Sequence, residues 1–105
     1  LIRLGKAIVG ITKYIDNQYF IARYYKDLLF VLEKEPDNLL ALYYCAIYYE
    51  KNGQVGKSHL NTAIIAFNTG RFADARKMAS IAMKELPSRS PDWYKASDII
   101  EATKQ

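Results

Sequence analysis

Apolar residues recur along this chain at steps of three and four residues, the spacing that places them on one face of an α-helix. The clearest run lies between residues 72 and 86, where charged residues take the opposite face. Its apolar positions are Phe72, Ala75, Met78, Ala79, Ala82, Met83 and Leu86. Three of these are alanines, which let a neighbouring helix come close. The pattern therefore predicts a helix that packs tightly against others.

Turn residues mark where this helix begins and ends. Gly70 can adopt the left-handed backbone that closes the preceding helix. Pro87 ends the helix, because proline has no N–H to donate and disfavours helix in the residue before it. The next helix begins with a capping hydroxyl, a proline at the first helical position and an acid near the positive end of the helix dipole: Ser90, Pro91 and Asp92.

The same pattern, followed along the whole chain, predicts an all-α fold of about six helices. Their approximate ranges are residues 3–16, 18–34, 39–51, 57–67, 72–86 and 91–103. Gly5 and Gly10 weaken the first of these, since glycine costs about 1 kcal/mol against alanine in a helix. The connections are short, so each helix should run antiparallel to its neighbours. A chain of 105 residues is long enough for one domain and too short for two.

Composition excludes several kinds of site. The net charge is +4, from 15 basic and 11 acidic residues, and the basic residues are scattered with no run of three. This distribution favours a solvated surface over a nucleic-acid-binding array, which stays as a weaker alternative. Cys45 and His59 are the single cysteine and the single histidine, so no zinc site of the His/Cys type and no internal disulfide can form. We therefore expect no enzyme, no cofactor and no metal.

The amino-terminal residues suggest a fragment or a processed product, since the chain begins at Leu1 and not at a methionine. The apolar stretch from residue 1 to residue 11 is interrupted by Arg3 and Lys6 and is too short to span a bilayer. We expect no membrane span in this sequence and assign no compartment.

A phosphate-binding loop is a second weak alternative. Gly56, Lys57 and Ser58 at the start of a helix would offer backbone N–H groups, a cation and a hydroxyl for magnesium. However, Lys51 stands where that motif requires a glycine, and the chain is too small for a nucleotide-binding sheet. An ordinary turn between helices is the preferred interpretation.

A repeat of 34 residues is visible in the spacing. Ser90 lies 34 residues after Gly56, and Trp93 lies 34 after His59. The order W-x2-L-G-x2-Y, then A-x3-F, then P is typical of tetratricopeptide repeats. Two stretches are similar to the first half of this pattern: Trp93, Ala96, Ser97 and Ile100, and also Leu42, Cys45, Ala46 and Tyr49. Two others are similar to its second half: Ala75, Ala79, Ala82 and Pro87, and more weakly Tyr24, Leu28, Val31 and Pro36. On these residues the chain resembles the tetratricopeptide repeat (TPR) family over nearly its whole length.

The resemblance implies a short right-handed α-solenoid of stacked antiparallel helix pairs. The repeat-like units would be about 5–38, 39–55 as a half unit, 56–89 and a final helix at 90–104. Pro36 and Pro87 are 51 residues apart, which is one and a half repeats. Residues 56–69 could therefore be the first or the second helix of a repeat, and we prefer the interpretation that they serve as both.

The resemblance also implies a concave groove that binds a partner protein or peptide, lined by the first helix of each repeat. The family's groove positions fall on Leu40, Tyr43, Ile47, Glu50, Lys57, Leu60, Ile64 and Phe67; Lys6, Val9, Lys13 and Asp16 would precede them, and Tyr94, Asp98 and Glu101 would follow. The lysine and asparagine clamp of chaperone-binding members is missing. Such a groove suits an apolar or aromatic segment, and a helix is one form it could take.

Two alternatives accompany this expectation. The exposed ends of a short repeat stack could instead support self-association into a homo-oligomer. The tyrosine run Tyr43, Tyr44, Tyr48 and Tyr49 either belongs to a central helix packed on both sides or lines the concave surface in part.

Overall fold

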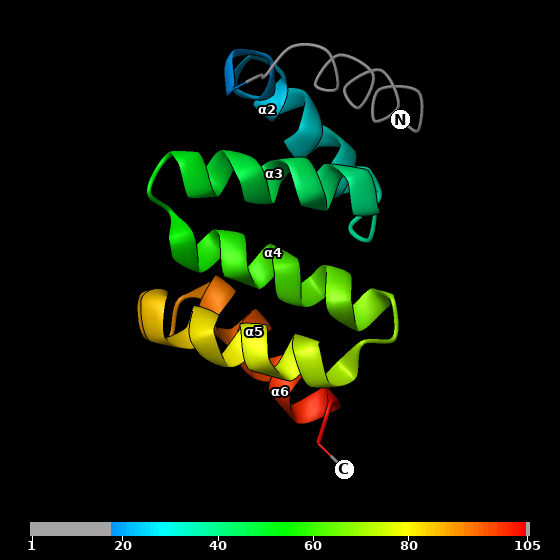
Figure 1. The fold of residues 1–105 in the computed structure, drawn as a ribbon, viewed down its shortest axis with the longest axis vertical. Helices are drawn as coiled ribbons and strands as arrows, with labels where there is room; N and C mark the ends of the chain where they lie inside the picture. Colours follow the sequence, from blue (N-terminus) through cyan, green and yellow to red (C-terminus); the bar gives the residue numbers. More distant parts are fainter. Residues whose placement is uncertain (1–17, 105) are drawn as a thin grey trace.

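The computed structural model describes residues 18–104, and within that range the chain is helical, with no strand. The helices are α2 (Gln18–Lys34), α3 (Leu39–Lys51), α4 (Val55–Asn68), α5 (Phe72–Glu85) and α6 (Pro91–Ala102) (Figure 1). The predicted all-α fold is confirmed for this part of the chain. It holds five of the six predicted helices, and the one expected at residues 3–16 lies outside it.

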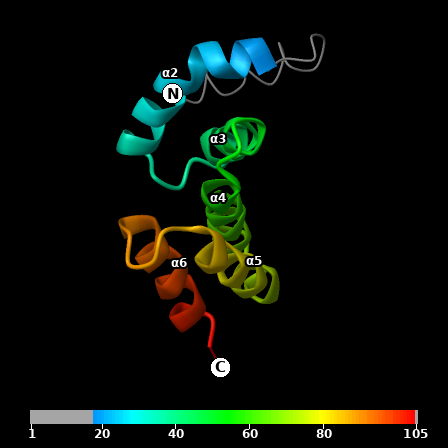
Figure 2. The same cartoon turned by 90° about the vertical axis from the view of Figure 1, so that its left-hand side faces the viewer.

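The helices form a stack in which each one packs against the next along the chain. Successive helices are in contact from α2 to α6, and α4 also contacts α6. Over residues 18–104, by contrast, α2 does not reach α4 and α3 does not reach α5. Figures 1 and 2 show α3, α4 and α5 as successive layers, while α6 lies to one side of α4 and α5. The stack therefore turns a corner at its carboxyl-terminal end.

Side chains cap the starts of two helices, and the cap predicted at Ser90 is confirmed. Asn38 precedes α3, and its side chain accepts a hydrogen bond from the backbone N–H of Ala41 at 3.0 Å. Ser90 does the same for α6, accepting from the N–H of Trp93 at 3.2 Å, with Pro91 in the first turn. Each cap satisfies a backbone donor that the first turn of a helix leaves unpaired.

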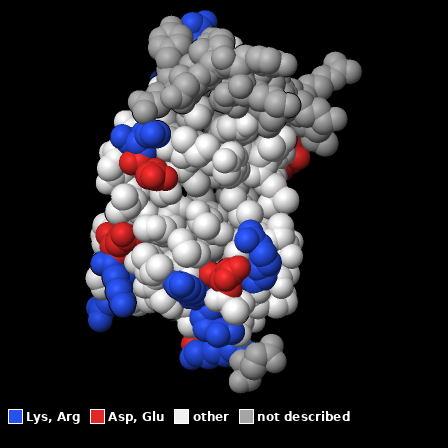
Figure 3. Space-filling model, in the orientation of Figure 1, with Lys and Arg blue, Asp and Glu red and all other residues white. Residues whose placement is uncertain are grey.

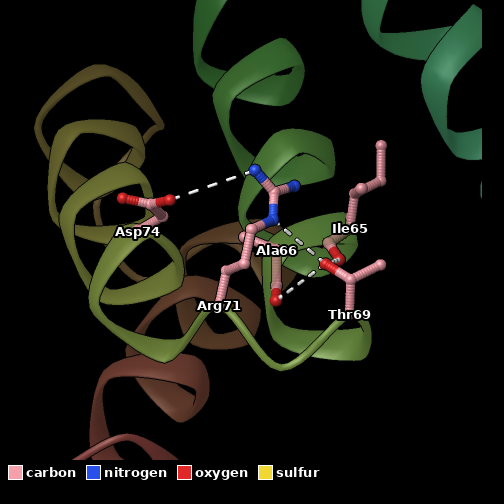
Figure 4. Close-up of polar contacts among 5 residues, drawn as sticks. All are labelled: Ile65, Ala66, Thr69, Arg71 and Asp74. Carbon is pink, nitrogen blue, oxygen red and sulfur yellow. Dashed lines mark hydrogen bonds and ion pairs between the residues drawn. The ribbon is translucent and has the colours of Figure 1, made fainter.

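The turn between α4 and α5 is closed by side chains as well as by backbone (Figure 4). Gly70 has φ +80°, the left-handed conformation predicted for it. The hydroxyl of Thr69 lies 2.8 Å from the carbonyl oxygen of Ile65 and accepts a 3.2 Å hydrogen bond from Nε of Arg71. Arg71 in turn lies 3.9 Å from the carboxylate of Asp74. The contacts of Thr69 and the backbone of Gly70 close the end of α4, and the exposed Arg71–Asp74 pair adds little to them.

Two separate sets of buried side chains hold the stack together. Around α4, α5 and α6 lies a group that we call the alanine seam, whose members are all 0% exposed: Ala63, Ala75, Ala79, Ala82 and Ala96. Between α2 and α3 lies a group of larger side chains that we call the tyrosine cluster: Ile21, Leu28, Val31, Tyr44, Cys45 and Tyr49, with Tyr25 and Tyr48 packed against it. The predicted close-packing role of the residue 72–86 helix is confirmed by the first group.

The tyrosine run of α3 is divided between the tyrosine cluster and the surface of the molecule. Tyr44 and Tyr49 are buried, whereas Tyr43 is 53% exposed. The ring of Tyr48 stacks on that of Tyr25 in α2, with 3.8 Å between the centroids. Aromatic pairing of this kind adds to the burial energy, so the run joins α2 to α3.

Candidate functional site

A groove lies between α2 and α6 and crosses α3 and α4. Its volume is about 680 Å³, within the range of about 300–1,000 Å³ that is usual for ligand pockets. Figure 2 shows the arrangement that creates it: α2 and α6 project to the same side of the molecule, and α3 and α4 form the surface between them. The groove exists because the helices on either side of α3 and α4 are too far apart to touch.

The floor of the groove is apolar. Residues from all four helices contribute, namely Leu29, Leu32, Leu42, Tyr49, Leu60, Ile64, Phe67 and Ile99. Leu42 and Leu60 are each only 3% exposed, so they form a firm base, whereas Leu29 is 38% exposed and stands on the α2 wall. The partly exposed apolar side chains of the lining, among them Leu29, Ile64 and Phe67, would gain free energy if a partner removed them from water.

The rim of the groove is charged, and most of the charge is negative. Four carboxylates and two ammonium groups line it: Glu33, Asp37, Asp92 and Asp98, against Lys57 and Lys95. The rim thus has a formal charge of −2 within a chain of net charge +4. The acidic residues occur on both walls, since Glu33 lies on α2 and Asp98 on α6.

Two asparagines join the helices beneath and beside the groove. Asn61 is buried, and its side chain donates to the carbonyl oxygen of Leu42 at 3.3 Å, which connects α4 to α3. Asn68 donates to the carboxylate of Asp37 at 2.9 Å, which connects the end of α4 to the α2–α3 turn. Both amides are therefore used within the protein, and they help to keep the groove in shape.

Tyr49 lies where the groove meets the tyrosine cluster. Its hydroxyl accepts a 3.1 Å hydrogen bond from the hydroxyl of Tyr25, and Nζ of Lys57 lies 5.6 Å from its ring centroid. Burial first, and then nearby negative charge including Asp92, raise the pKa of Tyr49 well above its ordinary value. The tyrosine therefore stays neutral and presents an apolar ring to the groove.

The structure brings together half of the predicted groove residues. Lys57, Leu60, Ile64 and Phe67, all on α4, line the groove. The α3 residues Leu40, Tyr43, Ile47 and Glu50 are absent from its lining, and α3 contributes Leu42 and Tyr49 instead. Of the residues expected on the last helix, Asp98 lines the groove and Tyr94 and Glu101 do not. Lys6, Val9, Lys13 and Asp16 lie outside the described residues.

The repeat pattern placed these four α3 residues in the groove because it makes α3 the first helix of a repeat. In the structure the four predicted residues that line the groove lie on α4, which contacts α3, α5 and α6. Small residues of α3, such as Ala41 and Cys45, are buried. A sequence signal was present: Ala41 and Cys45 stand 34 residues before Ala75 and Ala79. All four are buried, at 2% exposure or less. This spacing aligns α3 with α5 and not with α4.

The segment Gly56-Lys57-Ser58 forms the first turn of α4. A Cβ atom at Gly56 would lie 3.0 Å from the side chain of Leu86, so the glycine permits close approach of α4 to the end of α5. The residues before this segment are helical (α3), although a phosphate loop follows a strand. Close packing accounts for the glycine, and Ser58 is buried.

His59 follows this turn and pairs with a single carboxylate. Its Nδ1 atom lies 2.5 Å from the carboxylate of Glu85, which joins the start of α4 to the end of α5.

Over residues 18–104, no group of three or more potential metal-ligating side chains occurs. No helix in the same range is long and apolar enough to cross a membrane.

Surface charge elsewhere is mixed. On the face shown in Figure 3, lysine and arginine side chains are spread among aspartate and glutamate.

Comparison of the chain with models of protein families, with curated proteins and with solved structures found no match.

Proposed function

We propose that this chain is a TPR-like scaffold that binds a segment of a partner protein in the groove between α2 and α6. The observation that carries the proposal is the combination of an apolar floor with a charged rim in a preformed hollow of about 680 Å³. Reactive groups are not needed for such a role, and the groove provides shape and apolar contact.

The packing of α4, α5 and α6 supports the TPR-like part of the proposal. α4 and α5 form an antiparallel pair, and α6 packs back on α4, so the stack continues from one pair to the next. Five fully buried alanines at this junction allow three helices to meet. In this scheme α2 and α3 form the preceding pair, and α6 begins another.

Self-association is the alternative use of the exposed apolar residues. Phe30 and Tyr43 are each 53% exposed, and neither lines the groove. A second copy of the chain that covered these residues would leave the groove open. The two uses therefore place the binding energy on different residues.

The test compares two matched double variants. Leu29→Ala with Ile64→Ala removes apolar contacts on the α2 wall and the α4 floor, while Phe30→Ala with Tyr43→Ala removes exposed aromatic rings outside the groove. A partner captured from cell extract is purified, and its affinity is measured by calorimetry. We expect the groove variant to bind at least about tenfold more weakly, since each lost anchor is worth about 1 kcal/mol.

The control variant should bind the partner as the unaltered protein does, and far-UV circular dichroism should be the same for all three proteins. Loss of affinity in the control variant alone would overturn the groove assignment. Sedimentation equilibrium decides the alternative: a dimer that dissociates in the Phe30/Tyr43 variant would favour self-association.

A further inference from the structure

We infer that the occupant of the groove is a basic amphipathic helix of the partner protein, with an apolar stripe flanked by lysines or arginines. This inference rests on the proposed function and adds the chemistry of the partner. It follows from three features of the groove: the charge of its rim, the state of its polar groups and the spacing of its floor.

The rim charge selects a cationic partner. Both lysines of the rim already have favourable contacts, Lys57 with the ring of Tyr49 and Lys95 with Asp92 at 3.9 Å. Glu33 and Asp98, in contrast, have no ion-pair partner within residues 18–104. They stand on opposite walls, so cations on both sides of a bound segment would meet an unpaired carboxylate.

The polar groups of the groove favour a helix over an extended segment. An extended peptide leaves its backbone N–H and C=O groups in need of partners, whereas a helix satisfies them internally. The two carboxamides in the lining, Asn61 and Asn68, already donate to Leu42 and Asp37. The walls are themselves helices, so they offer no strand edge for pairing.

The floor has the spacing that a helical stripe would match. Ile64 and Phe67, which are partly exposed, follow the buried Leu60 at i+4 and i+7 along α4. Helices that bind in apolar grooves present anchors at this same spacing. A stripe of that kind, with a cation on each flank, would cover the floor and reach both walls.

Three synthetic peptides test the inference, each of about 18 residues so that an isolated helix can form. The first has a leucine stripe flanked by lysines, the second has the same stripe flanked by glutamates, and the third is a scramble of the first with no stripe. Fluorescence anisotropy of labelled peptides measures affinity at low and at physiological salt. We expect the leucine–lysine peptide to bind at least about tenfold more tightly than the other two, with affinity that falls as salt screens the rim.

A pair of matched variants localises the effect. Glu33→Gln with Asp98→Asn removes the two unpaired rim carboxylates, and Asp74→Asn with Glu101→Gln makes the same change in net charge at exposed positions outside the groove lining. The rim variant should bind the leucine–lysine peptide about threefold to tenfold more weakly, as expected for two partly exposed ion pairs. The control variant should bind it as the unaltered protein does, and thermal unfolding verifies that both remain folded.

Each outcome decides the inference. Equal binding of the lysine and glutamate peptides, or equal loss in both double variants, would overturn the basic partner while groove binding itself would stand. Binding of the scramble as tightly as the striped peptide would overturn the helical stripe. No binding by any peptide would also overturn the inference, and the capture experiment with Leu29 and Ile64 would still test the proposed function separately.

Discussion

The alanine seam and the tyrosine cluster solve the same packing problem with side chains of opposite size. In the seam, fully buried alanines let α4 contact both α5 and α6. In the tyrosine cluster, Tyr25, Tyr48 and Tyr49 fill the space between α2 and α3, and α2 reaches no further than α3 among residues 18–104. The small side chains of the seam allow α4, α5 and α6 to meet. The large side chains of the tyrosine cluster join α2 to α3, and α2 does not contact α4.

This difference in size is what opens the groove. Had α2 packed on α4 as closely as α6 does, the partly exposed floor residues Ile64 and Phe67 would be covered from that side. Instead, α2 lies away from α4 whereas α6 packs against it, and these two helices form the opposite walls of the groove with the apolar floor between them. The comparison therefore predicts different responses to mutation in the two regions.

The largest effect is expected from shrinking a side chain in the tyrosine cluster. Leu28 is 1% exposed, and Leu28→Ala should lower the free energy of unfolding by about 3 kcal/mol through lost burial and a cavity. Urea unfolding followed by far-UV circular dichroism measures this. Leu29→Ala, at a neighbouring position that is 38% exposed, is the control and should cost much less.

The same variant tests whether the two regions unfold together. Trp93, the single tryptophan, lies on α6 and packs against the seam, so its fluorescence reports on that region. Because stacked helices are stabilised mainly by their neighbours, the Trp93 transition should shift less than the circular dichroism transition. If the fluorescence and circular dichroism transitions shifted by the same amount, the two regions would unfold as one cooperative unit, which would contradict the distinction drawn between them.

A smaller effect is expected from enlarging a side chain in the seam. Ala79→Leu inserts bulk where α5 has no free space and should cost about 2 kcal/mol. Here the Trp93 transition should move at least as far as the circular dichroism transition. Ala73→Leu, on the exposed side of the same helix, should stay within about 0.5 kcal/mol of the unaltered protein. Equal costs at the two positions would contradict the seam.

The smallest effect is expected from raising the pH from 8 to 10, and it should arise in the tyrosine cluster. Burial raises the pKa of Cys45 from 9.0 to about 12, so folding favours the neutral thiol. Its contribution to stability is complete below pH 9 and is lost between pH 9 and 12, by at most about 1.4 kcal/mol per pH unit. Tyr49, whose pKa is also raised, acts in the same direction at still higher pH.

Urea unfolding at pH 8 and pH 10 measures this dependence, with Cys45→Ala as the comparison. The variant should lose less stability between the two pH values than the unaltered protein, because it lacks the thiol. No thiol, tyrosine hydroxyl or other ionisable side chain belongs to the alanine seam. An identical pH dependence in both proteins would remove Cys45 as the cause.

Sequence alone determined the helices and their ends. Periodic apolar residues, the cap at Ser90 and the turn at Gly70 act over a few residues, so their effect can be read locally. The alanines at residues 75–82 also indicated close packing before any neighbour was known. Local signals are sufficient for these features because hydrogen bonds within a helix join residues only four apart.

Only the tertiary structure decided which face of each helix meets the groove. The repeat pattern placed Tyr43 and Ile47 of α3 beside Leu60 of α4, whereas the fold brings Leu42 and Tyr49 there, with Asp98 from α6 and Leu29 from α2. That choice depends on how α3 rotates against two neighbours at once, which is set by side-chain volumes on all three helices. The rim carboxylates are likewise brought together from helices that are distant in the chain, and no local pattern encodes their proximity.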